Sequence, residues 1–287
     1  MPARREMQAA AVIRDPREGP DEHGAAVLRD ERGAAPSGAD RVLAVLRLLA
    51  GRPGGAGLHE LARELSSPKS SVHRALAALR RAGLVEQDPS GRYWLGWDFL
   101  HMAFSHYEHL DDVARVRPAL VALAERFGET AHYATLDLPE VVYRAKFQPP
   151  GARFQMSSVV GGRNPAHCTG VGKVLLAYVL SSTSGGVEGF VYEHGPLVRR
   201  TAHTLVEVEE LRRELAEIRR LGYGLDREES EEGIVCLALP IFLASTSVPA
   251  GAISIAAVAQ RTSLGELTQA IGDIRQIVRR ELGDVLG

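Results

Sequence analysis

The chain has 287 residues, which is enough for two domains that each bury their own core. With 45% hydrophobic and 24% charged residues, its composition is typical of a soluble globular protein. The formal net charge of −2 excludes a polycation, so any binding to nucleic acid requires a local basic patch. Two cysteines are too few for a disulfide framework and indicate a reducing compartment. No stretch has the length and apolarity of a membrane span or a secretion signal, so we expect a cytoplasmic protein.

Residues 1–38 mix both charge signs with Pro, Gly and Ala and contain few large apolar side chains. Such a segment cannot bury enough apolar surface to offset the entropy lost on ordering. We therefore predict a disordered N-terminal arm over residues 1–38. Whether this arm contributes to DNA binding stays open.

Residues 39–98 contain the pattern of three short helices followed by a hairpin. Apolar residues recur at three- and four-residue spacing in "ADRVLAVLRLLA", "LHELARELS" and "SPKSSVHRALAALRRAG". Asp40 and Ser67 are suitable N-caps for the first and third of these helices, and Gly83 is a suitable end for the third. The stretch "LVEQDPSGRYWLG" predicts two strands joined by an Asp-Pro-Ser-Gly turn. Together these elements predict a winged helix–turn–helix domain over residues 39–98.

The third predicted helix concentrates positive charge in a chain that is close to neutral. Four basic residues lie between residues 69 and 81, and the next acidic residue is Glu86. Short hydroxyls beside Lys and Arg suit contacts to phosphates and base edges, so we expect this helix in a major groove and Arg92 and Tyr93 of the hairpin along the DNA backbone. A solvated basic face is the alternative interpretation. The predicted DNA-binding residues are Lys69, Ser70, Ser71, His73, Arg74, Arg81 and Arg92.

The stretch "WDFLHMAFSHYEHLDDVARVRPALVALAERFGET" has a helical apolar period, and residues 99–112 within it are expected to form a linker helix. Leu100, Phe104 and Tyr107 are candidates for a contact between domains or subunits, or for packing on their own domain.

Residues 113–287 alternate between strand and helix patterns. This mixture indicates an α+β domain with one central sheet. The predicted strands are 131–137, 141–147, 153–160, 234–243 and 250–259, and the predicted helices are 169–181, 206–222 and 264–286.

Several motifs carry a resemblance to a known family. They are "LHELARELSSPKSSVHRALAALRRAGLV" with "RYWLG" behind it, "AHCTGVGKVLLA" at 166–177, "GYGLDREESEEGIVCLALPIF" at 222–242 and "AGAISIAA" at 250–257. In this order they resemble the IclR family of bacterial transcriptional regulators over roughly residues 40–283. The resemblance implies a winged helix–turn–helix domain followed by a GAF-like α+β effector-binding domain with a central antiparallel sheet.

The resemblance also implies a small effector, often a carboxylate, bound in the second domain. Backbone amides at the predicted helix start near residue 170 suit an anion. Where several relatives have a second serine, this chain has Ala256, which suggests an effector larger or more apolar than the smallest keto acids. The predicted effector-binding residues are Gly170, Val171, Gly172, Asp226, Cys236 and Ser254.

Other chemistries leave weaker signals. His167 and Cys168 are adjacent, but no further ligands at zinc-like spacing accompany them, and Lys173 lacks the flanking residues of a phosphate-binding loop. We therefore expect no metal, no cofactor and no catalytic residues. A cysteine-dependent enzyme or a redox-sensing regulator that uses Cys168 or Cys236 stays open as the alternative.

The function expected from the sequence is a regulator of transcription that binds DNA sequence-specifically and responds to a small, carboxylate-bearing metabolite. Its partners are expected to be a pseudo-palindromic double-stranded operator, an organic acid, and further copies of the chain in a homodimer or homotetramer. Repression is the expected mode of action, and activation stays open.

Overall fold

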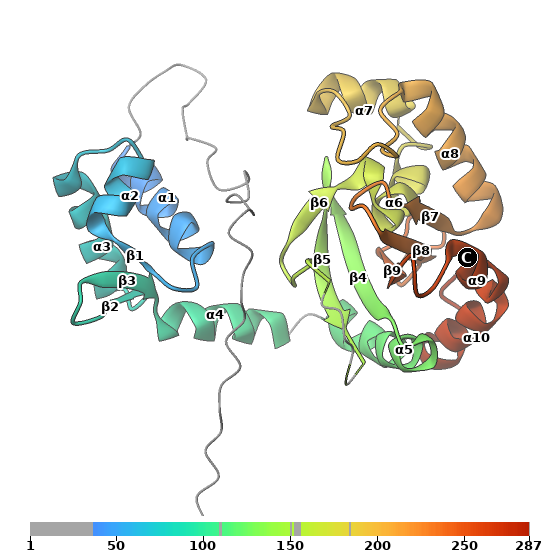
Figure 1. Cartoon of the computed structure of the whole chain (residues 1–287), viewed down its shortest axis with the longest axis horizontal. Helices are drawn as coiled ribbons and strands as arrows, with labels where there is room; N and C mark the ends of the chain where they lie inside the picture. Colours follow the sequence, from blue (N-terminus) through green and yellow to red (C-terminus); the bar gives the residue numbers. More distant parts are fainter. Residues whose placement is uncertain (1–36, 109–110, 150, 152–155, 184, 287) are drawn as a thin grey trace, which may run out of the picture. The chain divides into compact units, whose positions relative to one another are not determined.

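The computed structural model describes residues 37–108, 111–149, 151, 156–183 and 185–286. The chain divides into two compact units, residues 1–109 and 110–287 (Figure 1). All but the last two residues of the predicted arm, 1–38, lie outside the described residues. Among the residues that the structure describes, no helix is long and apolar enough to cross a membrane.

The N-terminal unit combines short helices with a small sheet. Its elements are α1 (Gly38–Ala50), β1 (Ala56–Gly57), α2 (Leu58–Glu64), α3 (Lys69–Arg81), β2 (Val85–Gln87), β3 (Arg92–Leu95) and α4 (Trp97–Glu108). The sheet is antiparallel, with strand order β1-β3-β2. The predicted three helices and hairpin are therefore present, and the glycine-rich segment before α2 adds the short strand β1, which was not predicted.

Two helix starts differ from the predicted ones. The N-cap of α1 is Ser37, whose hydroxyl accepts from Asp40 N at 3.2 Å while the Asp40 carboxylate accepts from Ser37 N at 2.9 Å. Asp40 is thus the third helical residue of a capping box and not the cap. The N-cap position of α3 is Pro68, because the Ser67 hydroxyl donates backward to Leu65 O at 3.1 Å and leaves the helix without a side-chain cap.

The end of α3 and the hairpin turn have the predicted form. Gly83 has a φ of +69°, and a Cβ at this position would overlap the Asp98 carboxylate, so the site requires glycine on both grounds. In the turn, Gly91 N donates to Asp88 O at 3.0 Å. The Asp88 carboxylate accepts from Arg92 N at 2.9 Å and so fixes the start of β3.

The predicted apolar stripes form the core of the N-terminal unit. Val45, Leu49, Leu61 and Leu76 are at most 2% exposed and belong to one cluster. Tyr93 lies in the same cluster at 4% exposure. The prediction that Tyr93 lies along the DNA backbone is therefore wrong: β3 alternates, and the face that carries Tyr93 packs on the helices.

The C-terminal unit is an α+β domain built on one antiparallel sheet. Its elements are α5 (Asp111–Phe127), β4 (Thr130–Asp137), β5 (Glu140–Phe147), β6 (Arg163–Pro165), the 3-10 helix η2 (Ala166–Cys168), α6 (Gly170–Val179), α7 (Gly186–His194), α8 (Val208–Leu221), β7 (Gly224–Arg227), β8 (Ile234–Ile241), β9 (Gly251–Val258), α9 (Leu264–Gln269) and α10 (Ile271–Leu282). The strand order is β6-β5-β4-β9-β8-β7. Every neighbouring pair is antiparallel, as the predicted fold class requires.

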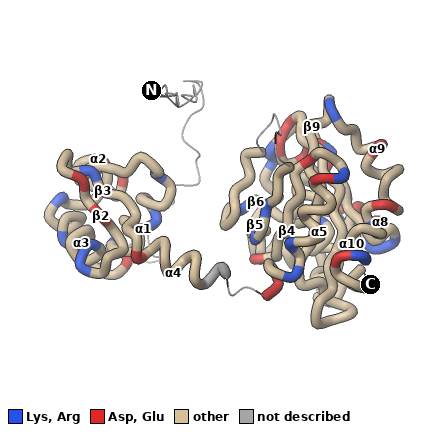
Figure 2. Tube along the Cα trace, turned by 90° about the horizontal axis from the view of Figure 1, so that it is seen from below, with Lys and Arg blue, Asp and Glu red and all other residues tan. Residues whose placement is uncertain are grey.

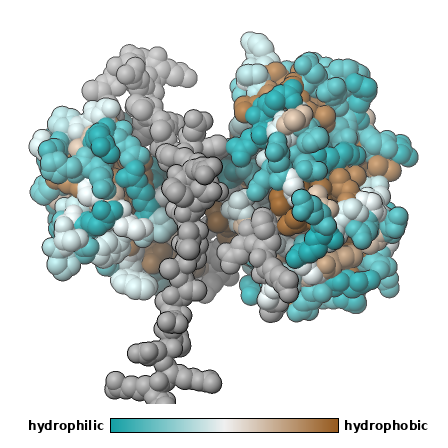
Figure 3. Space-filling model, in the orientation of Figure 1, coloured by the Kyte–Doolittle hydropathy of each residue, from teal (hydrophilic) through white to brown (hydrophobic). Residues whose placement is uncertain are grey.

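Helices cover both faces of this sheet (Figure 1). On one face, α6 packs against β8, β9 and β4, with α7 and α8 outside it. On the other face, α5 packs against β4 and β5 and lies beside α10. Figure 3 shows that hydrophilic side chains cover most of this side of both units and that separate apolar patches remain on the larger one.

In the C-terminal half, two helices differ from the prediction and a third is described only in part. For the predicted linker helix 99–112, α4 ends at Glu108 and α5 begins at Asp111, where two aspartates favour a helix N-terminus. Residues 109–110 lie outside the described residues, so the continuity of this helix stays a prediction. The predicted terminal helix 264–286 is broken at Ala270, whose ψ of 7° is not helical. Helix α7 was not predicted from the sequence.

The predicted strand 153–160 is also wrong for its described part, residues 156–160. The carbonyl oxygens of Met156 and Ser158 accept from the Lys146 side chain instead of from a neighbouring strand. A turn follows, in which Gly162 N donates to Val159 O at 2.9 Å. The strand that completes this edge of the sheet is β6, which pairs with β5.

Candidate nucleic-acid interface and ligand pocket

The side of α3 opposite the core carries a row of polar and basic residues. Leu76 and Leu79 are buried on the inner side. With 3.6 residues per turn, Ser70, Arg74 and Arg81 follow one another along the outer side, at spacings of four and seven residues. All three are exposed. The helix therefore presents hydroxyl and guanidinium groups to solvent along its whole length.

Lys69, Ser71 and His73 flank this row. Lys69 and His73 are exposed, and Ser71 is half-buried, with its hydroxyl 3.5 Å from Arg74 Nη2. The helix has no acidic residue, and Figure 2 shows the basic positions along it. These side chains form a continuous basic surface of the kind that contacts DNA.

Arg92 has a structural role that was not predicted. Its Nη2 donates to Gly55 O at 2.8 Å and its Nε to Gly54 O at 3.3 Å. Its Nη1 lies 3.6 Å from Glu60 Oε1. The guanidinium thus joins β3 to the loop before β1 and to α2, whereas its DNA contact stays a prediction.

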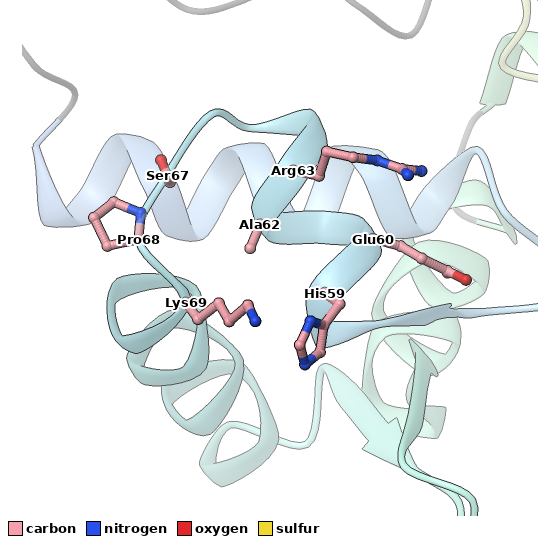
Figure 4. Close-up of a pocket in the computed structure, with 7 residues that line it drawn as sticks. All are labelled: His59, Glu60, Ala62, Arg63, Ser67, Pro68 and Lys69. Atoms are coloured by element: carbon pink, nitrogen blue, oxygen red, sulfur yellow. The ribbon is translucent and has the colours of Figure 1, made fainter.

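An open hollow lies between α2 and the start of α3 (Figure 4). Three basic side chains line it, His59 and Arg63 from α2 and Lys69 from α3, and Figure 4 shows His59 and Lys69 pointing toward each other across it. Glu60 also lines the hollow and is ionised, because a hydrogen bond from Gly57 N at 2.9 Å lowers its pKa; Arg92 Nη1, 3.6 Å away, faces this carboxylate. The hollow extends the basic surface of α3 onto α2 and suits a phosphate group.

In the C-terminal unit, the strand register brings three predicted residues to one face of the sheet. Asp226 is paired with Cys236, and Ser254 is paired with Ala238, two residues farther along β8. Directly paired residues share a face, and side chains alternate along each strand. Asp226, Cys236 and Ser254 therefore point to the same side, together with His132 of β4, which is the partner of Ser254 in the sheet.

The start of α6 lies against this face. A Cβ on Gly170 would come within 3.0 Å of Cys236 Sγ and 3.5 Å of Asp226 N, so the absence of a side chain lets the helix approach the strands closely. Gly170 and Val171 are the first two residues of α6, whose amides have no acceptor within the helix. The helix dipole adds positive potential at the same point.

Gly172 differs from the other predicted residues, because it does not line the pocket. Its amide donates to Thr169 Oγ1 at 3.1 Å, which is the N-cap bond of α6. A Cβ on Gly172 would lie 2.2 Å from Ala166 O. Position 172 therefore requires glycine because α6 packs closely on η2, and not because a ligand approaches its backbone.

Together these elements enclose a pocket with a cavity volume of about 40 Å³. That is roughly the room that one or two water molecules occupy in the liquid. Met156, Ile234, Cys236 and Ala256 form its apolar part. The lining residues are His132, Tyr143, Met156, Ser157, Ser158, Asn164, Thr169, Gly170, Val171, Asp226, Ser230, Glu231, Ile234, Cys236, Ser254 and Ala256.

Residues 156–158 form one wall of the pocket and are held by side chains from β4, β5 and the loop between β7 and β8. Lys146 Nζ donates to the carbonyl oxygens of the first and last of them, at 2.9 and 2.7 Å. His132 Nε2 lies 2.8 Å from the hydroxyl of Ser158, and the hydroxyl of residue 157 donates to Glu231 Oε2 at 2.7 Å.

The ionisable groups of the pocket have shifted pKa values. Burial, and then the charge of Lys146, lowers the pKa of His132 to about 3, so its imidazole is neutral near pH 7. Burial raises the pKa of Asp226 to about 6, although Ser230 Oγ and Glu229 N each donate to its carboxylate at 2.7 Å. Near pH 7 the His132 imidazole is therefore uncharged, whereas most of the Asp226 carboxyl, whose pKa lies about one unit below that pH, is ionised.

Both cysteines are buried thiols without activation. Burial is the main cause that raises the pKa of Cys168 and of Cys236 to about 12. His167 Nε2 donates to Val198 O at 3.0 Å, and Cys168 Sγ lies 3.5 Å from Pro165 O. Within the described part of the chain, no three His, Cys, Asp or Glu side chains are arranged to hold a metal ion.

Sequence reasoning missed several lining residues. His132, Tyr143 and Asn164 come from β4, β5 and β6, which no motif connects to the predicted site. The alternation of "AHYATLD" indicates that His132 shares a face with other residues of its strand, but only the pairing of β4 with β9 brings it beside Ser254.

A winged helix–turn–helix domain with an exposed basic helix, followed by an α+β domain, defines the class of DNA-binding regulators. Comparison with known families agrees. The family described as "Bacterial transcriptional regulator IclR C-terminal" matches residues 105–280, and the "IclR helix-turn-helix domain" matches residues 38–89. This chain belongs to the IclR family of bacterial transcriptional regulators, which are not enzymes.

Curated relatives align with most of the chain. The "DNA-binding transcriptional repressor YiaJ" of Escherichia coli (strain K12) is 30% identical over 262 residues, 88% of this chain and 90% of its own length. The "Glycerol operon regulatory protein" of Streptomyces coelicolor is 32% identical over 251 residues, 85% of this chain and 95% of its own.

Solved structures share the fold. The IclR protein of Thermotoga maritima has a TM-score of 0.68 at 25% identity, covering 85% of this chain and 98% of its own. An IclR homolog of Microbacterium hydrocarbonoxydans, complexed with 4-hydroxybenzoate, has a TM-score of 0.72 at 24% identity, covering 86% of this chain and 99% of its own.

Proposed function

We propose that this protein is a ligand-responsive transcriptional repressor of the cytoplasm that binds a pseudo-palindromic operator as a homo-oligomer and is controlled by a small organic acid. The observation that carries the proposal is the convergence of Asp226, Cys236, Ser254 and the first amides of α6 on one pocket. That pocket lies in the same chain as an exposed basic helix of a helix–turn–helix domain.

In this proposal α3 enters the major groove. Ser70, Arg74 and Arg81 face the base edges, since they form the row opposite the core. The hollow lined by Arg63 and Lys69 takes a backbone phosphate. In an oligomer, two such helices read half-sites about 10 bp apart, or a multiple of that distance.

The effector is an organic acid whose carboxylate faces the amides of Gly170 and Val171. The hydroxyl of Ser254 is a further donor to it. Ala256 supplies a methyl group to the pocket where several relatives carry a second serine, and Met156 extends the apolar part. These neighbours favour an acid larger or more apolar than glyoxylate or pyruvate. Because the cavity is about 40 Å³, its entry moves residues 156–158.

Two further observations support the proposed homo-oligomer and the proposed repression. The surface of α4 exposes large apolar side chains, with Trp97 at 74%, Met102 at 53% and Phe104 at 62% exposure, which favours a contact between copies of the chain in a dimer or tetramer. Repression is favoured because a curated relative aligned over 88% of this chain is a repressor.

The test begins with selection of genomic DNA fragments on the purified chain at about 150 mM salt, where nonspecific binding is weak. Wild type should recover fragments that share an inverted repeat, and Arg74→Ala should not. Arg213→Ala, which removes an exposed arginine of α8, is the matched control and should behave like wild type. Recovery of unrelated fragments by wild type, with and without the acids named below, would contradict the proposal.

The effector is tested on the recovered repeat. Glyoxylate, pyruvate and 4-hydroxybenzoate, the compound of the Microbacterium complex, are titrated by calorimetry, and operator affinity is measured with and without each. The proposal expects 4-hydroxybenzoate to bind more tightly than the two keto acids. Tighter binding of glyoxylate or pyruvate would refute the size argument based on Ala256.

A further inference from the structure

Lys173 is a fully buried cation to which the preceding proposal gives no role. Its side chain is 0% exposed, and it lies on α6 one turn after Gly170. Its ammonium donates to Glu229 Oε1 at 2.5 Å and to Glu214 Oε1 at 3.1 Å. A buried ammonium is tolerated only when it is paired. The pair with Glu229 is also nearly closed to solvent, because the Glu229 side chain is 3% exposed.

Glu229 belongs to the turn 226–230, which begins in the last two residues of β7. Its backbone N donates to Asp226 Oδ1 at 2.7 Å, and its carbonyl oxygen accepts from Thr204 Oγ1 at 2.7 Å. Its second carboxylate oxygen, Oε2, is buried and has no hydrogen-bond partner among the residues that the structure describes. The other oxygen, Oε1, accepts from Lys173 Nζ and from Arg227 N at 3.3 Å, so Lys173 is the cation that balances the negative charge of Glu229.

The same turn contains a residue in an unfavourable conformation. Glu228 has a φ of +63°, a value that non-glycine residues rarely adopt. Its carbonyl oxygen accepts from Thr201 Oγ1 at 2.7 Å. Such a conformation persists only where surrounding contacts hold it. The turn thus depends on anchors outside itself, which include the ion pair of Glu229 with Lys173 of α6 and that of Arg227 with Glu214 of α8.

The turn carries two residues of the pocket. Asp226 and Ser230 line it, and Ser230 Oγ donates to Asp226 Oδ2 at 2.7 Å. Lys173 and Glu229 do not line it. Glu214 of α8, the second partner of Lys173, also accepts from Arg227 Nη1 at 2.9 Å. The network therefore joins α6, α8 and the end of β7 behind the pocket wall.

We propose that the buried Lys173–Glu229 pair positions the turn 226–230, and with it Asp226 and Ser230, as the wall of the effector pocket. Lys173 and Glu229 are positioning residues that act on the effector through the turn and do not touch it. The inference rests on the proposed function, since it assigns the effector to this pocket.

The first experiment needs no ligand. Hydrogen exchange is measured on the full chain as wild type, Lys173→Met, the double variant Lys173→Met with Glu229→Gln, and Glu217→Gln as a control. Glu217 pairs with Arg220 on the exposed side of α8. Lys173→Met leaves a buried carboxylate without its cation, so amides of the turn should exchange about tenfold faster or more, while β4 and β9 keep the wild-type rate.

The double variant removes both charges and should return the turn to within about threefold of wild type, because no buried charge then lacks a partner. The control should match wild type. If the exchange rates of the turn, β4 and β9 all rise equally in Lys173→Met, the ion pair has a general structural role. If the exchange rates of the turn stay at the wild-type values in this variant, the ion pair does not hold the turn. Either result overturns the inference.

The second experiment connects the turn to the effector, with 4-hydroxybenzoate as the probe in calorimetry. Wild type and Glu217→Gln should bind it equally, and Lys173→Met should bind it at least about tenfold more weakly, with recovery in the double variant. Equal binding by Lys173→Met with a loosened turn overturns the inference. Failure of wild type to bind the probe counts against the proposed effector, while the exchange data still decide whether the pair positions the turn.

Discussion

Two arginines of the DNA-binding unit carry the same charge in different surroundings. The Arg74 guanidinium lies in the exposed row of α3, where its Nη2 donates to Ser71 Oγ at 3.5 Å. The Arg92 guanidinium donates to the carbonyl oxygens of Gly54 and Gly55 and faces Glu60. Replacing each by alanine should therefore change different properties.

The structure sets the expected magnitudes. Arg74→Ala should weaken operator binding by about 1–3 kcal/mol, or about 5- to 150-fold, if it contacts a base, and should change stability by less than about 0.5 kcal/mol because it is exposed. Arg92→Ala loses two hydrogen bonds at a 44% exposed side chain, worth about 1–2 kcal/mol of unfolding free energy after solvation of the carbonyls. For a unit of this size that corresponds to a fall in Tm of roughly 4–16 °C.

Operator affinity is measured by fluorescence anisotropy at three salt concentrations, and stability by thermal unfolding of the same samples. Arg74→Ala should also relax discrimination at one base pair, whereas a phosphate contact would lower the salt slope by about one and leave discrimination intact. Wild-type affinity in a folded Arg74→Ala would remove this residue from the interface. A large loss of affinity in Arg92→Ala at wild-type Tm would show that Arg92 contacts DNA and that its bonds to the carbonyls are incidental.

Three other perturbations test the rest of the structure. Burial raises the pKa of Asp226 from 3.8 to about 6 in the folded protein, so its contribution to stability is complete below about pH 4 and is lost as the pH rises through 6. In urea unfolding, the stability of Asp226→Asn should therefore fall less than that of wild type over this pH range. An equal fall in both proteins would refute the raised pKa of Asp226. Iodoacetamide at pH 7.5 should modify Cys168 and Cys236 slowly in the native chain and rapidly after unfolding, and fast native modification would instead favour an activated thiol. Leu76→Ala, at a fully buried position of α3, should lower the unfolding free energy of the N-terminal unit by about 2–5 kcal/mol in denaturant titration, and a loss below about 1 kcal/mol would contradict the packing of α3.

Local features of this protein were open to prediction from its sequence. The apolar spacing of α1, α2 and α3 places Leu49, Leu61 and Leu76 in the core, and Gly83 ends α3 where its positive φ is needed. Short-range periodicity, turn residues and helix ends depend on neighbours within a few positions, so they are visible in the chain itself. The row of basic residues on α3 follows from the same period.

Caps and irregular segments were less predictable, because several conformations satisfy the same local pattern. The N-cap of α1 is Ser37 and not the expected Asp40, which is a shift toward the N-terminus. The N-cap of α3 is Pro68 and not the expected Ser67, which is a shift toward the C-terminus. Residues 156–160 have a strand-like sequence, yet a lysine from β5 binds the carbonyl oxygens that a strand partner would use.

The pocket was decided by the tertiary structure. The motifs named Gly170, Asp226, Cys236 and Ser254, but their meeting depends on the order β4-β9-β8-β7 and on a register that places one strand's residues opposite the next. His132 joins them only through that pairing. The paired residues His132 and Ser254 are more than a hundred positions apart in the sequence. A local sequence pattern does not show which strands become neighbours in the sheet. Burial likewise gave Tyr93 of the hairpin a structural role, and hydrogen bonds to the distant Gly54 and Gly55 carbonyls gave one to Arg92. The packing of the whole unit, and not the sequence around a residue, determines such contacts.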